Sequence, residues 1–211
     1  MVIEFIESIN STQDILVKMV KSNKVKPPYA IVAKYQSLGV GSRGNIWESE
    51  GENLHFSFCI DKNSLSEDIL PESVSIYFAF IMKEYLASKG SKLWLKWPND
   101  FYLDDKKIGG VISNKIKNTY ICGIGINLVQ SPTYAKKLDI EISVNDVVKD
   151  FLELLENKFS WKEIFSKFLL EFKISKNFTA HIDGEIHSLK DATLCSDGSI
   201  VINNKKVYSL R

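Results

Sequence analysis

The sequence predicts an α+β protein in which a main domain of strands and helices is followed by a small all-β domain. Three observations support this prediction. Strand-like and helical segments are mixed up to about residue 143, and two amphipathic helical segments follow. Residues 178–211 then contain short alternating runs separated by Asp-Gly and Asn-Asn turns. We therefore expect a main domain over residues 1–175 and a small β domain over residues 176–211.

The first third of the chain predicts strands, one helix and a loop. VIEFI (residues 2–6) is typical of a short strand, and NSTQDILVKMVK predicts a helix in which Ser11 and Asp14 form a capping pattern. PPYAIVAKYQS and NLHFSFCI predict two further strands. Between these strands, residues 39–51 hold four glycines and no apolar period, which predicts a loop.

The remaining elements are predicted in the same way. Residues 72–89 contain no helix breaker and predict a mostly buried helix that ends before Gly90. KLWLKW predicts a strand that ends at Pro98, FYLDDKKIGGVIS a hairpin with Asp104 and Asp105 at its turn, and NTYICGIGINL a glycine-bearing strand. VNDVVKDFLELLENKF and WKEIFSKFLLEFKIS predict two helices, and the terminal domain should hold three to five strands.

Composition excludes several classes of protein. The chain has 211 residues, 45% hydrophobic residues and a formal net charge of +1, so its charge gives no argument for nucleic acid or an anionic membrane. The N-terminus lacks the features of a signal peptide, and no run approaches the roughly 20 apolar residues of a membrane span. Three widely spaced cysteines without zinc-site spacing are typical of a reducing cytoplasm, where we expect this protein.

The loop GVGSRGNIW (residues 39–47) has features of an anion-binding site. Its glycines let backbone N–H groups approach a ligand, Arg43 offers a planar donor fork, and Trp47 is suited to stack on a flat ring. The alternative is a surface loop whose tryptophan packs into the core, and this segment alone favours that alternative. Although GVGSRG fits GxGxxG, no βαβ unit surrounds it, and the P-loop pattern is absent.

Two lysines raise the question of a shared ligand. Lys96 ends a predicted strand, and Lys107 lies on the predicted hairpin that follows, so both amines could face one cavity. The alternative is that Lys107 is a solvated lysine beside Lys106. Asn99 and Asp100 lie at a turn after a proline, where an Asp can help to hold magnesium through water or phosphate.

Glycines and a helix start complete the pattern. Gly109 and Gly110 indicate a bulge or a close approach, while Gly123 and Gly125 leave room on one face of a strand, as expected where a ligand lies flat across a sheet. STQ at residues 11–13 is a helix cap on its own, but its amides and hydroxyls can also bind a polar neutral group. The chain has three histidines and no pattern of a nucleophile with a base, so any chemistry would rest on positioning and on the charges of lysine and arginine.

These motifs together resemble biotin protein ligases. KWPNDFYLDDKKIGG is similar to the central signature of that family, in which KWPND is followed by a turn and K-[LI]-[AG]-G. YQSLGVGSRGNIW resembles the family loop Q-x-x-G-R-G-R-x-G-R-x-W, STQ stands at the place of S-T-N, and GIGINL matches G-x-G-[IV]-N. Order and spacing agree over residues 5–130. The resemblance implies a mixed-sheet catalytic domain of the biotin/lipoate ligase type and an SH3-like C-terminal domain.

The resemblance also implies a two-step reaction. Biotin attacks the α-phosphate of ATP, with Mg²⁺, to give biotinyl-5′-AMP, and a carrier-protein lysine then takes the biotinyl group. Lys96 would contact the carboxylate and the α-phosphate as the catalytic residue. The biotin-binding residues would be Ser11, Thr12, Gln13, Gln36, Val40, Gly41, Ser42, Lys96 and Gly109. The nucleotide-binding residues would be Arg43, Trp47, Asn99, Lys107 and Asn127, with the magnesium ligands unassigned.

The partner implied is the biotin carboxyl carrier protein of acetyl-CoA carboxylase or of another biotin-dependent carboxylase. Only ten residues precede Ser11 where larger members carry a winged helix, so the chain resembles the short type and we expect no binding to DNA or membranes. The oligomeric state stays open, a weak homodimer included.

The sequence departs from the family pattern at several positions. The family loop usually has arginines where Val40, Ser42 and Asn45 stand, and Gln13 replaces an asparagine. Two alternatives remain: a lipoate ligase, although its R-x-[SG]-G-G-x-x-x-H-D loop is absent, and a non-catalytic biotin-binding module.

Overall fold

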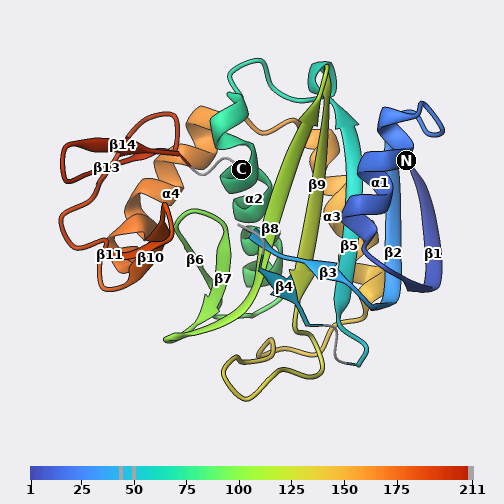
Figure 1. Cartoon of the computed structure of the whole chain (residues 1–211), viewed down its shortest axis with the longest axis horizontal. Coiled ribbons are helices and arrows are strands. Elements are labelled where there is room, and N and C mark those ends of the chain that lie inside the picture. The colour runs from blue at the N-terminus through green and yellow to red at the C-terminus, as the bar shows by residue number, and fades with distance from the viewer. Residues whose placement is uncertain (43–44, 49–50, 209–211) are drawn as a thin grey trace.

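A seven-stranded sheet forms the centre of the molecule (Figure 1). The computed structural model describes residues 1–42, 45–48 and 51–208. In spatial order the strands are β1 (Val2–Ile9), β2 (Tyr29–Gln36), β5 (Leu54–Asp61), β9 (Thr119–Ile126), β8 (Lys106–Ile116), β7 (Asp100–Leu103) and β6 (Trp94–Lys96). The pair β1–β2 is parallel and the other neighbours are antiparallel, so the sheet is mixed. The predicted α+β class is confirmed.

Helices cover both faces of this sheet. The helix α1 (Thr12–Lys21) packs on one face through a small cluster that includes Leu16 and Cys59. The helices α2 (Val74–Ser88), α3 (Val144–Leu154) and α4 (Trp161–Ser175) belong to the main core on the other face. Short 3₁₀ turns are formed by Lys62–Ser64, Pro71–Ser73 and Leu155–Asn157. None of the described helices is long and apolar enough to cross a membrane.

The start of α1 follows the predicted cap. Ser11 has extended backbone dihedrals, and its Oγ accepts a hydrogen bond from the backbone N–H of Asp14 at 3.2 Å. A side-chain acceptor at this position satisfies one of the free N–H groups of the first turn. The cap therefore fixes the point at which the helix begins, and it places Thr12 and Gln13, both buried, against the sheet.

The glycine-rich segment differs from its prediction as a loop. Two short strands, β3 (Gly39–Val40) and β4 (Ile46–Trp47), pair antiparallel there, with Gly39 opposite Trp47. A Cβ on Gly39 would lie 2.4 Å from the backbone oxygen of Trp47, so the close pairing needs a residue without a side chain at this position. Strands of two residues leave no alternating pattern, which is why the sequence predicted only a loop here.

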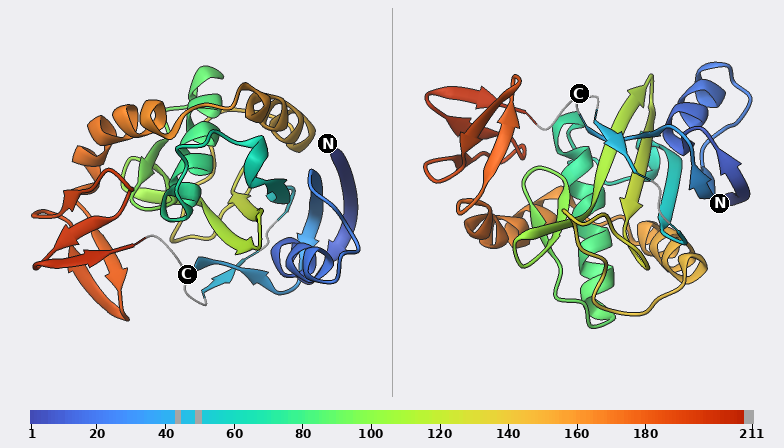
Figure 2. Two further views of the ribbon diagram at one scale, coloured as in Figure 1. Left: turned by 90° about the horizontal axis from the view of Figure 1, so that it is seen from above. Right: turned by 60° about the horizontal axis from the view of Figure 1, so that its bottom comes forward.

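Five short strands follow α4: β10 (Thr179–Ile182), β11 (Glu185–Ser188), β12 (Thr193–Leu194), β13 (Ile200–Ile202) and β14 (Lys205–Val207). They form one two-stranded and one three-stranded sheet at the opposite end of the molecule from β1 (Figures 1 and 2). The turn residues Asp183, Gly184, Asn203 and Asn204 all have positive φ, as two-residue hairpin turns of type I′ require. The predicted three to five strands and their turns are confirmed.

Two tryptophans fasten this C-terminal module to the rest of the chain. The indole N–H of Trp97 donates to the backbone oxygen of Gly198 at 2.8 Å, and that of Trp161 donates to the oxygen of Ser196 at 2.7 Å. Trp97 is fully buried and follows Lys96 directly. The module is therefore bonded to the segment that carries one of the predicted site residues.

Candidate active site

A cavity lies on the α1 face of the sheet, between the start of α1, the β3–β4 hairpin and the central strands. Seven of the predicted biotin-binding residues line it: Ser11, Thr12, Gln13, Gln36, Val40, Gly41 and Ser42. The cavity is also lined by residues of β5, β8 and β9, among them Ser57, Ile112, Gly123 and Ile124. The structure thus brings together residues that are spread over more than 100 positions of the sequence.

A buried polar network forms one wall of this cavity. Gln36 Oε1 accepts from the backbone N–H of Thr12 at 2.7 Å and from the Thr12 hydroxyl at 3.0 Å. The Thr12 and Ser57 hydroxyl oxygens lie 2.8 Å apart. All three side chains are buried, and buried polar groups with several partners are held in one orientation. This wall is therefore rigid before any ligand binds.

Gln13 presents an acceptor to the cavity. Its Nε2 donates to Asn114 Oδ1 at 2.9 Å and to the backbone oxygen of Ile121 at 3.2 Å. Its Oε1 is buried and has no partner among the described residues. A Cβ on Gly123 would lie only 2.7 Å from this oxygen, so the glycine leaves the space in which the oxygen lies. Leaving a buried acceptor unpaired is costly, so Gln13 Oε1 is an acceptor that the described residues leave unsatisfied at this cavity.

Trp47 occupies the space above the second glycine of β9. A Cβ on Gly125 would lie 2.8 Å from Cε2 of the indole ring. The predicted room beside Gly123 and Gly125 therefore exists, and Gln13 and Trp47 use it. Trp47 is half-buried. Its exposure is less than that of a free stacking surface and more than that of a core residue, so it agrees fully with neither of the two predictions. Its neighbour in the predicted loop, Arg43, lies outside the described residues.

A second cavity adjoins the first. The two share four lining residues, Gly41, Ser42, Trp47 and Lys107, so these residues form the wall between them. Among the other residues lining the second cavity are Gly109, Asn127, Glu48 and Tyr134. Three predicted nucleotide-binding residues, Trp47, Lys107 and Asn127, thus gather there. Gly109, predicted on the biotin side, lines this second cavity, and Asn99, predicted on the nucleotide side, lines the first.

Asp100 interacts with Lys107 and also affects Lys96 through its charge. Lys107 Nζ is 2.6 Å from Asp100 Oδ1, and Lys96 is paired with Asp100 across β6 and β7. Lys96 is only 8% exposed, and its Nζ lies 3.4 Å from the Tyr102 hydroxyl oxygen and 5.0 Å from the centre of that ring. Burial lowers the pKa of Lys96, Asp100 raises it and Lys107 lowers it, with a net decrease.

Lys96 is absent from the described residues that line the two cavities, whereas Asn99, Asp100 and Lys107 line the first. Its ammonium has a long hydrogen bond to the hydroxyl of Tyr102. The two lysines thus extend from two strands, β6 and β8, and both interact with the carboxylate of Asp100.

Comparison with known proteins agrees with this geometry. The model of the biotin/lipoate A/B protein ligase family matches residues 5–129, which is more than half of the chain. The chain belongs to this family. Its structure is similar to that of a biotin acetyl-coenzyme A carboxylase synthetase from Helicobacter pylori with bound biotinylated ATP, with 43% identity, a TM-score of 0.94 and 98% of each chain covered. The predicted resemblance to biotin protein ligases is confirmed.

More distant relatives extend the comparison. The bifunctional ligase/repressor BirA of Escherichia coli (strain K12) is 32% identical over 127 residues, which are 57% of this chain and 38% of BirA. The biotin–protein ligase of Schizosaccharomyces pombe (strain 972 / ATCC 24843) is 26% identical over 92% of this chain and 36% of its own length. The chain thus spans less than two fifths of these curated relatives. The Aquifex aeolicus biotin protein ligase, 22% identical, shares the fold with a TM-score of 0.77 and 96% of its chain covered.

This member of the ligase family has site residues that the sequence did not reveal. His55 and Ser57 face the cavity from β5, and both are fully buried. Burial lowers the pKa of His55, while backbone hydrogen bonds to Ala33 and Lys34 raise it, with a net decrease that favours the neutral ring. The signal was present in NLHFSFCI, where polar residues alternate with phenylalanines. Alternation shows that two faces differ, but it does not show which face meets a ligand.

Proposed function

We propose that this chain is a biotin–[biotin carboxyl carrier protein] ligase. It activates biotin with ATP to biotinyl-5′-AMP and transfers the biotinyl group to a lysine of a carrier protein. The carrier is that of acetyl-CoA carboxylase or of another biotin-dependent carboxylase. The observation that carries this proposal is the pair of cavities joined at Gly41, Ser42, Trp47 and Lys107, because it fits two substrates that react where they meet. The 43% identity to the H. pylori synthetase supports it.

The first cavity takes biotin. Its polar end suits the ureido group, which offers two N–H donors and a carbonyl acceptor. Gln13 Oε1, unpaired among the described residues, accepts from a ureido N–H, while Ser11 and Thr12 bind the remaining polar atoms. Ile112 and Ile124 contact the apolar rings and chain. The carboxylate of biotin then lies toward the wall shared with the second cavity.

The second cavity takes the nucleotide. Trp47 faces both cavities, and a half-buried indole held against Gly125 offers a flat surface for the adenine ring. Asn127 lines this cavity, where its carboxamide, already bonded through Nδ2 to the backbone oxygen of Lys136 at 3.2 Å, is fixed in orientation. Lys107 lies on the shared wall and is placed to meet the phosphates.

The first step forms a mixed anhydride. A carboxylate oxygen of biotin attacks the α-phosphorus of ATP, a new P–O bond forms, and the bond to the bridging oxygen breaks with release of pyrophosphate. Negative charge increases on the α-phosphate oxygens and on the leaving group. Lys96 and Lys107 stabilise that charge, and the largest contribution comes from cations that are in place before the charge develops.

The second step transfers the acyl group. The neutral amine of a carrier-protein lysine attacks the carbonyl carbon of biotinyl-5′-AMP, an amide bond forms, and AMP leaves with the electrons of the anhydride C–O bond. The amine proton passes to solvent. No nucleophile of this chain is required, which agrees with a site built from amides, hydroxyls and lysines.

Magnesium would accompany the nucleotide. Asp100 lines the first cavity and Glu48 the second, and magnesium is usually bound by one or two carboxylates together with substrate phosphates. Within the described part of the chain, no group of three or more His, Cys, Asp or Glu side chains is arranged around a metal position. The donors fit an ion that the ATP phosphates help to hold, and such an ion would neutralise phosphate charge.

Biotin-dependent exchange of labelled pyrophosphate into ATP tests the proposal. We expect exchange with biotin and none with lipoate, followed by labelling of a biotin carboxyl carrier domain. Exchange with lipoate alone would identify a lipoate ligase. Binding of biotin without exchange would leave a non-catalytic biotin-binding module, and either result would overturn the proposal.

We further propose that residues 1–175 and 176–211 are two domains and that the protein acts in the cytoplasm. The boundary is supported by the end of α4 at Ser175 and the start of β10 at Thr179. The location is supported by the three widely spaced cysteines, which are typical of a reducing compartment.

A further inference from the structure

The strand that carries Lys96 lies at the edge of the sheet. β6 pairs with β7 on one side only. In an edge strand of this kind every second backbone N–H points away from the sheet and lacks a strand partner. Along this segment those N–H groups are accepted by side chains: Leu93 by Ser91 Oγ at 3.2 Å, Leu95 by Glu171 Oε1 at 2.5 Å and Trp97 by Ser175 Oγ at 3.0 Å.

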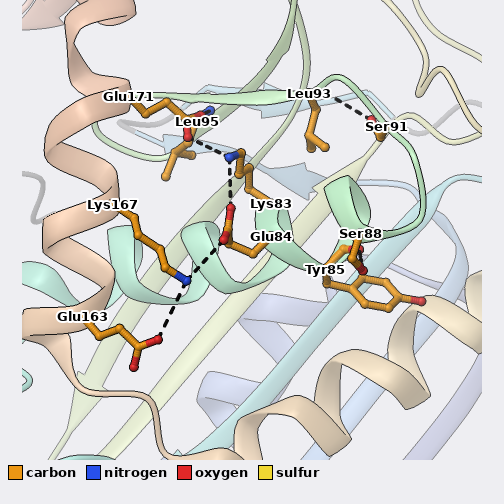
Figure 3. A network of polar contacts seen from close by, with 10 residues as sticks. All are labelled: Lys83, Glu84, Tyr85, Ser88, Ser91, Leu93, Leu95, Glu163, Lys167 and Glu171. Carbon is orange, nitrogen blue, oxygen red and sulfur yellow. Dashed lines mark hydrogen bonds and ion pairs between the residues drawn. The ribbon is translucent and has the colours of Figure 1, made fainter.

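Two of these acceptors come from one face of α4. Glu171 and Ser175 are four residues apart, which corresponds to about 6 Å along a helix. Leu95 and Trp97 are two residues apart, which corresponds to about 6.6 Å along a strand. The spacings match, so α4 runs beside β6 and takes the place of a further strand. Figure 3 shows the side chain of Glu171 extending from α4 to the backbone nitrogen of Leu95.

The carboxylate of Glu171 is itself held by a cation. Lys83 Nζ of α2 lies 2.8 Å from Glu171 Oε2 and 3.1 Å from Glu84 Oε1 (Figure 3). The Lys83 and Glu171 side chains are only 16% and 11% exposed. Burial lowers the pKa of Lys83, but its hydrogen bonds and charge contacts with Glu171 and Glu84 outweigh burial and raise it. Lys83 therefore stays charged, and its ammonium holds the Glu171 carboxylate against Leu95.

Few contacts hold the side chain of Lys96 in place. Among the described residues, its ammonium has one long hydrogen bond, to the Tyr102 hydroxyl at 3.4 Å, and a contact with the ring of that tyrosine. The position of its amine near a phosphate thus depends on the backbone from which it extends. That backbone is held on both sides of Lys96 by α4, through Leu95 and Trp97.

We propose that Glu171 is a positioning residue for Lys96 in the adenylation step, with Lys83 and Ser175 as its partners. This inference rests on the proposed function. Glu171 does not reach the substrates; it acts through the backbone of Leu95. A displacement of a reacting group by about 1 Å can cost on the order of 100-fold in rate, so loosening β6 should reduce turnover while the biotin cavity keeps its shape.

Three variants separate positioning from general stability. Glu171→Ala removes the acceptor of the Leu95 N–H, and Glu171→Gln keeps an oxygen acceptor without the charge. Glu84→Ala is the control, because Glu84 contacts the same Lys83 and also Lys167, and neither of these ion pairs involves the backbone of β6. The measurements are kcat and KM of biotin-dependent pyrophosphate exchange, the calorimetric Kd for biotin, Tm, and amide hydrogen exchange of Leu95.

For Glu171→Ala we expect kcat to fall on the order of 10- to 100-fold. The Kd and KM for biotin should stay within about twofold of the wild-type values, since the cavity lining is untouched. Leu95 should exchange faster in Glu171→Ala than in wild type, and Glu171→Gln should restore most of kcat and slow Leu95 exchange. Glu84→Ala should keep a wild-type kcat.

A folded Glu171→Ala protein with wild-type kcat would overturn the inference, as would a Glu171→Gln protein as impaired as Glu171→Ala. A loss of kcat that Glu84→Ala shares at equal Tm would also overturn it, because general loosening would then explain the effect. If Glu171→Ala does not fold, Ser175→Ala gives the same test at the Trp97 N–H. A wild-type chain without biotin-dependent exchange would instead overturn the proposed function itself, and with it this inference.

Discussion

Replacing Lys96 by methionine should abolish most of the adenylation activity and leave the fold intact. The residue is 8% exposed, and Lys96→Met keeps the apolar length of the side chain while removing its charge. A group aimed at charge that develops in the transition state contributes about 3–4 kcal/mol. With about 1.4 kcal/mol per tenfold change in rate, we expect kcat for biotin-dependent pyrophosphate exchange to fall roughly 100- to 1,000-fold.

The same substitution should not lower stability. Burial lowers the pKa of Lys96 in the folded chain below its usual value, so at neutral pH the folded state holds this proton less favourably than the unfolded state does. Removing the ammonium removes that cost, and Tm should stay the same or rise. Lys106→Met, at the start of β8, is the control for loss of a positive charge. Near-normal exchange in a folded Lys96→Met protein would refute the role that we assign to Lys96.

Two further predictions follow from the same region. Asp100→Asn removes the carboxylate that raises the pKa of Lys96. The alkaline fall of exchange activity should therefore move to lower pH, and a pH–rate profile in which it is unmoved or moves upward would contradict this. Gly123→Ala places a Cβ 2.7 Å from Gln13 Oε1. An unwanted methyl group in a pocket costs about 1–3 kcal/mol, so the calorimetric Kd for biotin should rise roughly 10- to 200-fold in a folded protein, whereas an unchanged Kd would show that Gln13 is not a biotin ligand.

Much of the fold could be predicted because its signals are local. The Ser11 cap needs only Ser11 and Asp14, and the hairpin turns at residues 183–184 and 203–204 need residues that tolerate positive φ. The order of the strands could not be predicted in this way. β5 lies between β2 and β9 because distant segments pack together, and no short pattern in the sequence records that contact.

The same distinction between local and distant signals applies to the candidate site. Residues within motifs, such as Gln13 and Lys107, could be predicted, and the structure gathers them around two adjoining cavities. The hydrogen-bond partners that hold the site in place could not be predicted from the sequence. Ser57 meets Thr12 across 45 positions of the sequence, and Glu171 meets Leu95 across 76. In the sequence, a glutamate and a serine on an amphipathic helix look the same as the polar residues of its solvent-exposed face.

The wall between the two cavities is short of cations. Lys107 is the one lysine or arginine among the described residues that line either cavity, and it is already paired with Asp100 at 2.6 Å. The backbone N–H of Gly41 is also committed, because it donates to the oxygen of Asn45 at 2.7 Å within the hairpin. A phosphate on this wall therefore finds fewer free donors than the glycine-rich sequence suggested.

We therefore predict that biotinyl-5′-AMP escapes readily from this protein and that Ser42→Arg slows its release. Ser42 lines both cavities, so an arginine there can reach the phosphate. A hydrogen bond to a charged group contributes about 1.5–3 kcal/mol, which corresponds to roughly 10- to 150-fold in the dissociation rate. Ser42→Gln, long but neutral, is the matched control. The off-rate of preformed adenylate is measured directly, and escaped adenylate is detected by biotin labelling of an unrelated bystander protein. Equal off-rates in wild type and Ser42→Arg would show that the wall already holds the phosphate, and equal slowing by Ser42→Gln would show that size rather than charge limits release.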